Sequence, residues 1–207
     1  MNHSDLYEMG KKYEARDDME KAYRCYLEAA LSEDDGEAMY ELGNMHFEEN
    51  RFKEGYNKAG RFFGFAYDRN AKIAPWTLII AGDYWKEHAG EDEKGLVFAI
   101  KYYRAAAELG EEYGYACLGE LYYKLGEYEK AYKNLLKVKQ ENQLVFYYMG
   151  RLCDEGHVVE KDRDKAVEYY KKAIECVSEI VDKYGDEYGM DDHCRMAEKR
   201  LKELGAE

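Results

Sequence analysis

The sequence resembles itself at a nearly regular interval, and this repetition constrains the fold more than any other feature. A glycine that follows an apolar residue recurs five times, at intervals of 33, 39, 37 and 31 residues: Gly10, Gly43, Gly82, Gly119 and Gly150. One helical hairpin of this length cannot bury its apolar face alone. The repetition therefore predicts a stack of hairpins in which each unit packs mainly on its neighbours.

A second small residue follows each of these glycines by 12 to 17 residues. The predicted set is Ala22, Gly55, Ala99, Ala131 and Ala166. In four units a large side chain lies four residues further on, on the same helical face: Tyr26, Tyr103, Leu135 and Tyr170. We expect the glycine to let the second helix approach closely, with the large side chain filling the space beside that contact. The second unit departs from this pattern, because Gly55 and Phe62 stand where alanines are expected.

Signals for helix ends divide each unit into two helices. Residues suited to N-caps precede the predicted helices: Asp18, Asp35, Asn50, Asn142 and Asp162. Pro75 suits a first helical turn, and glycines stand near predicted helix ends: Gly90, Gly110, Gly126 and Gly185. Strand signals, such as alternating Val/Ile/Thr runs, are absent from the sequence. We therefore predict an all-α chain that forms a single repeat domain, with hairpins at 4–33, 36–69, 75–110, 111–139 and 142–184.

The end of the chain is predicted to cap this stack. Residues 163–184 are expected to form one long helix, followed by a capping helix over 191–204. The capping helix has one apolar stripe, at Cys194, Ala197, Leu201 and Leu204. A one-sided terminal helix is what a stack of repeats needs to close its open end.

These residues resemble a known family of helical repeats. The segment LYEMGKKY…AYRCY of the first unit is similar to a tetratricopeptide (TPR) repeat. The fifth unit, YYMGRLCDEGHVVEKDRDKAVEYYKKA, resembles a Sel-one-like repeat, with Asp164, Lys165 and Ala166 at matching positions. The resemblance covers about residues 4–177 and implies a right-handed α-solenoid of about five helix-turn-helix repeats. Cys153 stands where the pattern has tyrosine, so we expect looser packing there.

Composition limits the partners. The chain has 44 acidic and 31 basic residues and a net charge of −13, which disfavours binding to nucleic acid. The longest apolar stretch, 73–82, is about half the roughly 20 residues that span a bilayer, and residues 1–20 lack a signal-peptide core. The five cysteines form no CxxC pair, which favours reduced thiols. We expect no membrane partner and a cytoplasmic location.

Catalytic motifs are not found in the sequence. It has no HExxH, GxSxG or phosphate-binding loop, so we predict no catalytic residue, no metal site, no cofactor and no enzymatic activity. One dense cluster of ligand-type residues, Asp191-Asp192-His193-Cys194, keeps a hydrolase or metal-dependent enzyme as the last alternative. Acidic residues at a helix N-terminus explain this cluster better.

The resemblance implies a binding surface on the concave face, which the first helix of each hairpin lines. The predicted ligand-binding residues are Tyr7, Lys11, Tyr40, Asn44, Phe47, Asp83, Lys86, Glu120, Tyr123, Tyr147 and Arg151. Aromatic residues with interspersed charge suit a peptide or protein segment, and the carboxylates favour a basic or neutral one. We therefore predict a non-enzymatic scaffold for protein–protein interaction. The alternative is a self-assembling structural protein, a homodimer formed through Phe62, Phe63 and Phe65.

Overall fold

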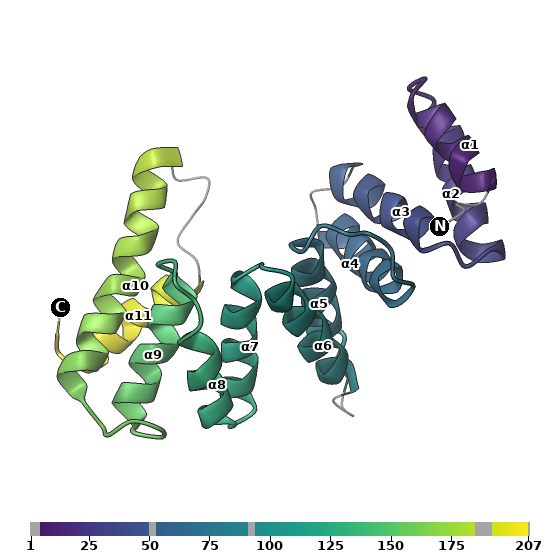
Figure 1. The fold of residues 1–207 in the computed structure, drawn as a ribbon. Coiled ribbons are helices and arrows are strands. Elements are labelled where there is room, and N and C mark those ends of the chain that lie inside the picture. Colours follow the sequence, from purple (N-terminus) through teal and green to yellow (C-terminus); the bar gives the residue numbers. More distant parts are fainter. Residues whose placement is uncertain (1–4, 50–52, 91–93, 185–191, 207) are drawn as a thin grey trace. The chain divides into compact units, whose positions relative to one another are not determined.

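The computed structural model describes residues 5–49, 53–90, 94–184 and 192–206 (Figure 1). These residues form eleven α-helices and no strand, so the predicted all-α fold is confirmed over this part of the chain. The chain divides into two compact units, Met1–Glu111 (unit 1) and Glu112–Glu207 (unit 2). Each unit is described by itself. That all five hairpins form a single domain stays a prediction.

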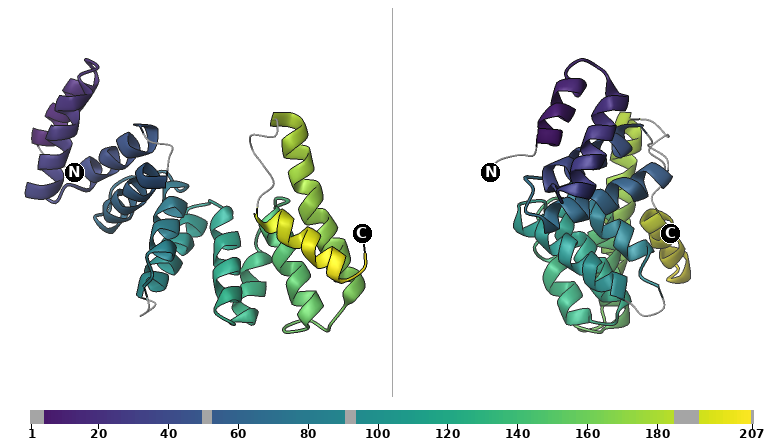
Figure 2. Two further views of the ribbon diagram at one scale, coloured as in Figure 1. Left: turned by 180° about the vertical axis from the view of Figure 1, so that it is seen from behind. Right: turned by 90° about the vertical axis from the view of Figure 1, so that its right-hand side faces the viewer.

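Unit 1 contains three helical hairpins in chain order. Their helices are α1 (Asp5–Glu14), α2 (Met19–Ser32), α3 (Gly36–Glu49), α4 (Lys53–Asp68), α5 (Thr77–Glu87) and α6 (Lys94–Glu108). Each helix packs against the next one along the chain, as two views of the ribbon show (Figure 2). Unit 1 is therefore a layered stack in which contacts are mostly between neighbours.

Unit 2 contains two hairpins and one further helix. Its helices are α7 (Tyr113–Lys124), α8 (Tyr128–Leu135), α9 (Gln143–Glu155), α10 (Arg163–Tyr184) and α11 (Asp192–Glu203). The first helices α7 and α9 pack on each other, and α11 packs on both α9 and α10. The buried side of α11 carries Cys194, Ala197 and Leu201, as the apolar stripe predicts, and Leu204 is half-buried.

The close helix contact predicted at the repeat glycines is present in all five hairpins. A Cβ atom added to any of these glycines would lie 2.3–2.7 Å from a large side chain of the second helix. Those side chains are Tyr26, Phe63, Tyr103, Leu135 and Tyr170. Since real Cβ atoms do not come so close to other atoms, only glycine lets the two helices pack at this distance.

The predicted register of the second hairpin was wrong by four residues. Ala59, Phe63 and Ala66 are completely buried, whereas Phe62 is half-buried. Ala59 follows its glycine by 16 residues, the same offset as Ala166 in the fifth hairpin. The second hairpin is therefore regular, with Ala59 in the place first given to Gly55. Its connecting segment is longer than the one in the first hairpin, and this shifted the alignment.

Most predicted helix ends are confirmed by side-chain caps. Asp18, Asp35, Asn142 and Asp162 each accept a hydrogen bond from a backbone N–H in the first turn of the next helix. Pro75 lies in the turn that precedes α5. Gly90, Gly110 and Gly126 follow helices with positive φ values of 68°, 99° and 74°. Asn50 and Gly185 lie outside the described residues.

Candidate functional site

The predicted binding residues differ in exposure between the two units. Seven of them lie on the first helices of unit 1, and all seven are partly exposed. We call this set the first-helix row: Tyr7, Lys11, Tyr40, Asn44, Phe47, Asp83 and Lys86. In unit 2, Glu120, Tyr123 and Tyr147 are buried, and Arg151 is partly exposed. The accessible part of the predicted site is therefore the part in unit 1.

Polar contacts join α1 to α3 within the first-helix row. Lys11 Nζ lies 2.7 Å from a carboxylate oxygen of Glu14 and 3.2 Å from one of Glu41. Asn44 Nδ2 donates to the other oxygen of Glu41 at 3.2 Å. One carboxylate on α3 thus holds an ammonium group from α1 and an amide from its own helix.

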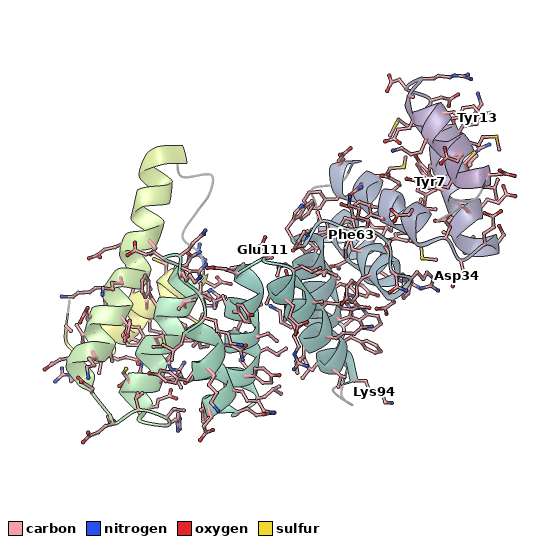
Figure 3. The ribbon with its side chains drawn as sticks, in the orientation of Figure 1. Tyr7, Tyr13, Asp34, Phe63, Lys94 and Glu111 are labelled. Atoms are coloured by element: carbon pink, nitrogen blue, oxygen red, sulfur yellow. The ribbon has the colours of Figure 1, made fainter. Side chains whose placement is uncertain are left out.

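The aromatic residues of the row use part of their surface for packing inside unit 1. The ring of Tyr7, seen on α1 in Figure 3, lies 5.8 Å from the ring of Tyr26. The Tyr40 ring packs 5.6 Å from Phe63, and its hydroxyl oxygen accepts a hydrogen bond from the Ala74 backbone N–H. These rings are fixed by their neighbours, so a partner would meet them in a preorganised state.

A buried tyrosine of the second helix donates its hydroxyl hydrogen bond to a carboxylate of the first helix in three hairpins. The donor and acceptor pairs are Tyr26 with Glu14 at 2.7 Å, Tyr103 with Asp83 at 2.6 Å and Tyr170 with Asp154 at 3.4 Å. Buried hydroxyls need such partners, because an unsatisfied one is costly. The sequence analysis missed this role. Its signal is an acidic residue one or four positions after the repeat glycine.

Asp83 has further partners beside Tyr103. Tyr56 on α4 donates to it at 2.9 Å, and Lys86 Nζ lies 3.3 Å away. Asp83 therefore connects α4, α5 and α6, so its contribution to the row is structural as well as electrostatic.

Burial and hydrogen bonding set the protonation of these groups. Burial, together with the carboxylate of Glu41, raises the pKa of Tyr7. Burial alone would raise the pKa of Glu14, but hydrogen bonds from Lys11 and Tyr26 outweigh it and leave that pKa lowered. Tyr7 is therefore neutral and Glu14 charged at neutral pH.

The unit 2 members of the predicted site form an internal network. Arg151 donates to the Tyr147 hydroxyl at 3.0 Å and to Glu155 at 2.7 Å, and Tyr123 also donates to Glu155. The Tyr147 ring lies 5.7 Å from His193 on α11. These side chains hold α7, α9 and α11 together and leave little surface for a partner.

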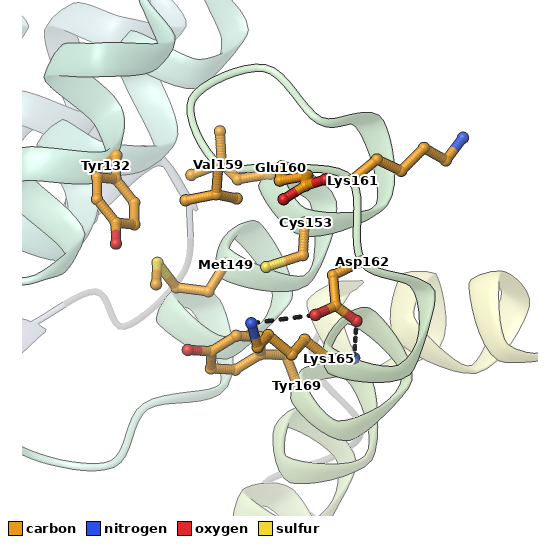
Figure 4. Close-up of a pocket in the computed structure, with 10 residues that line it drawn as sticks. Tyr132, Met149, Cys153, Val159, Glu160, Lys161, Asp162, Lys165 and Tyr169 are labelled. Carbon is orange, nitrogen blue, oxygen red and sulfur yellow. Dashed lines mark hydrogen bonds and ion pairs between the residues drawn. The ribbon is translucent and has the colours of Figure 1, made fainter.

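A hollow of about 300 Å³ lies beside Cys153 (Figure 4). Met149, Tyr169 and Tyr132 line it together with the turn before α10. This agrees with the looser packing expected where cysteine replaces the tyrosine of the repeat. Burial, with Asp162 nearby, raises the pKa of the Cys153 thiol. The thiol is therefore protonated at neutral pH and poorly nucleophilic.

The 191–194 cluster does not converge in the structure. Asp191 lies outside the described residues, the Asp192 side chain is 86% exposed, and Cys194 is buried at 1% exposure. Among the described residues, no group of three or more His, Cys, Asp or Glu side chains is arranged to hold a metal ion. None of the helices in the described ranges combines the length and apolar character needed to cross a membrane.

Comparison with known proteins identifies the repeat. The Sel1 repeat matches four segments, 1–34, 36–70, 90–111 and 147–177, which together cover more than half of the chain. No curated protein matches the sequence.

Two solved structures are similar to the chain as a whole. A Sel1 repeat protein from Oxalobacter formigenes is 21% identical with a TM-score of 0.50, over 98% of this chain and 88% of that one. MamA is 23% identical with a TM-score of 0.54, over 84% of this chain and 96% of that one. At this level of identity the likeness concerns the fold. The repeated glycine contacts, the paired helices and the four matched segments together show that the chain belongs to the Sel1 repeat family.

Proposed function

We propose that the first-helix row of unit 1 binds a basic or neutral segment of a partner protein. Proteins of the Sel1 repeat family generally mediate protein–protein interactions and are typically non-enzymatic scaffolds. Fold alone does not fix a function. The proposal therefore depends on the chemistry of the row.

The observation that supports this role most directly is the partial exposure of all seven residues of the row. Aromatic side chains held by packing give a partner a large contact area at low entropic cost. Residues that are buried in unit 2, such as Tyr123 and Tyr147, are not part of the proposed surface.

Charge favours a basic or neutral partner. Both lysines of the row, Lys11 and Lys86, already pair with carboxylates of unit 1. Glu48 is exposed on α3 beside the row. A Lys or Arg of a partner would therefore approach a surface on which acidic groups outnumber available cations, which promotes association and fixes its direction.

The test begins with affinity purification from the native cell and mass spectrometry, followed by titration calorimetry with the segment identified. Asn44→Arg and Glu48→Lys each add positive charge at the row. We expect each to weaken binding about tenfold, with a steep dependence on salt. The control, Glu108→Lys on α6, makes the same charge change at an exposed site outside the row and should alter affinity by less than about twofold.

Unchanged affinity in both row variants would place the binding surface elsewhere. Light scattering at several protein concentrations distinguishes the alternative, a self-assembling protein. If the protein forms a dimer that Asn44→Arg dissociates, the row serves self-association instead.

A further inference from the structure

A groove of about 590 Å³ lies between the second helices α2 and α4 of unit 1. We call it the second-helix groove. Leu27 and Leu31 line it from α2, Phe62 and Phe65 line it from α4, and Met39 lies between them on α3. Both α2 and α4 pack on α3, which therefore forms the floor.

The apolar lining follows from helical spacing. Leu27 and Leu31 are four residues apart and share one side of α2, while Phe62 and Phe65 share one side of α4. Leu31 is 79% exposed, the largest exposure among the big hydrophobic residues that the structure describes as exposed. An apolar stripe that continues to so exposed a residue is suited to contact with another molecule.

The rim of the groove is positive although the chain carries a net charge of −13. Lys58, Arg61 and Arg69 all line it, and all three come from α4. Asp34, labelled in Figure 3, is the single carboxylate in the lining and forms an ion pair with Arg69. The Arg61 guanidinium lies 5.4 Å from the centre of the Phe65 ring. Cations stacked on aromatic rings beside an apolar surface present both kinds of contact together.

We propose that the second-helix groove binds an amphipathic segment of a partner protein that carries acidic residues beside an apolar stripe. Helix-in-groove recognition places the apolar face of such a segment into the groove. Its carboxylates then meet Arg61, Arg69 and Lys58, which gives orientation and speeds association. A segment with basic flanks would meet like charge and be rejected.

The groove is distinct from the first-helix row. Met39 and His46, seven residues apart on α3, line the groove, whereas Tyr40 and Asn44 belong to the row. Different sides of α3 thus carry the two surfaces. The two proposals require partners of opposite charge and can fail independently.

The probe is a displayed library of random peptides, each of about 16 residues, a length that forms four helical turns. Selected peptides are synthesised with a fluorescent label and titrated with the full chain by anisotropy. We expect enrichment of acidic peptides with apolar residues at helical spacing. Arg61→Glu and Leu31→Asp should each weaken their binding about tenfold or more. Lys12→Glu, an equal charge change to Arg61→Glu at an exposed site on α1, should change affinity by less than about twofold.

Leu31 is exposed, so Leu31→Asp should fold normally, and circular dichroism checks this for each variant. Selection of basic peptides alone, or unchanged binding of acidic peptides to both groove variants, would overturn the proposal. Self-association of the wild type that Leu31→Asp abolishes would assign the groove to a second copy of the chain and would also overturn it.

Discussion

Equivalent repeat positions have different environments in unit 1 and unit 2. Tyr7, Tyr40 and Tyr147 all lie three residues before a repeat glycine. The first two are partly exposed, whereas Tyr147 is 3% exposed, with His193 of α11 beside it. The repeat determines which side of its helix a residue occupies. The element packed on that side determines whether the residue can meet a partner.

Acidic residues show the same difference. Glu120 and Asp154 of unit 2 are 6% and 5% exposed, whereas Asp83 of unit 1 is partly exposed. Asp154 pairs with Arg200 of α11, and Glu120 pairs with Lys124 at 2.6 Å. In unit 2 the capping helix turns a face of first helices into a polar interior. Unit 1 has no equivalent helix over its row among the described residues.

The largest effect should come from removing the cation that α11 supplies. Arg200→Met leaves the carboxylate of Asp154 buried without its ion partner, although Tyr170 still donates to it. We expect a loss of about 2–3 kcal/mol in the free energy of unfolding, measured by urea denaturation, because an unpaired buried charge is costly.

Arg195→Met, on the same helix, is the matched control. Its ion pair with Asp192 is exposed and spans 3.7 Å, so the change should cost less than about 0.5 kcal/mol. Equal costs for the two variants would contradict the contrast between a capped and an open first-helix face.

The next effect tests a feature that both units share. Gly82→Ala places a methyl group 2.3 Å from the buried ring of Tyr103, and we expect it to cost about 2 kcal/mol despite the better helix propensity of alanine. Gly119→Ala in unit 2 meets the branched end of Leu135 instead, which can move, and should cost less. Thermal melts of both variants, with Tyr103→Leu as a partial rescue of Gly82→Ala, measure this order. A larger cost at Gly119 would show that the contacts are not equivalent.

Acid stability provides a smaller test. The pKa of Glu155 is lowered: burial would raise it, but hydrogen bonds from Tyr123 and Arg151 outweigh that effect. A lowered folded-state pKa adds stability above the unfolded pKa of about 4.3, and this is lost as the pH falls through the folded value. The stability difference between the wild type and Glu155→Gln should therefore shrink from pH 7 to pH 3.

Glu14→Gln in unit 1 should behave in the same direction, because the pKa of Glu14 is also lowered. Its effect should be smaller, since the Glu14 side chain is 36% exposed and that of Glu155 is 25% exposed. Urea titrations at both pH values measure the two differences. A difference that grows on acidification would contradict the assignment.

The smallest effect concerns the hollow beside Cys153. Cys153→Phe should fill part of it and raise stability by about 1 kcal/mol, as cavity-filling changes do. Cys117→Phe in the same unit is the control. Cys117 is 3% exposed and does not line this hollow, so the larger side chain should destabilise by roughly 1–3 kcal/mol. Calorimetric melting temperatures compare the two.

Local signals predicted much of the fold. Repeat glycines, caps such as Asn142 and the apolar stripe of α11 all depend on residues close in sequence, and the structure confirms them. The second hairpin was misaligned because loop length, rather than residue type, sets the distance from Gly43 to Ala59.

The candidate site was harder to predict because exposure depends on distant contacts. Nothing near Tyr147 in the sequence indicates that His193 of α11 packs beside it. The structural role of Glu14 likewise appears only once Tyr26 is placed opposite it. The second-helix groove arises from the separation of α2 and α4 on α3, which no single segment encodes.

The glycine contacts keep nearly the same geometry while the connecting segments change length. The alanine follows its glycine by 12 residues in the first hairpin, 17 in the third and 16 in the fifth, yet each glycine meets the same kind of ring. Insertions within a hairpin are therefore absorbed at its tip and do not propagate into the layers. Such tips are natural places to lengthen the chain, for instance to graft an epitope, without disturbing how neighbouring repeats meet.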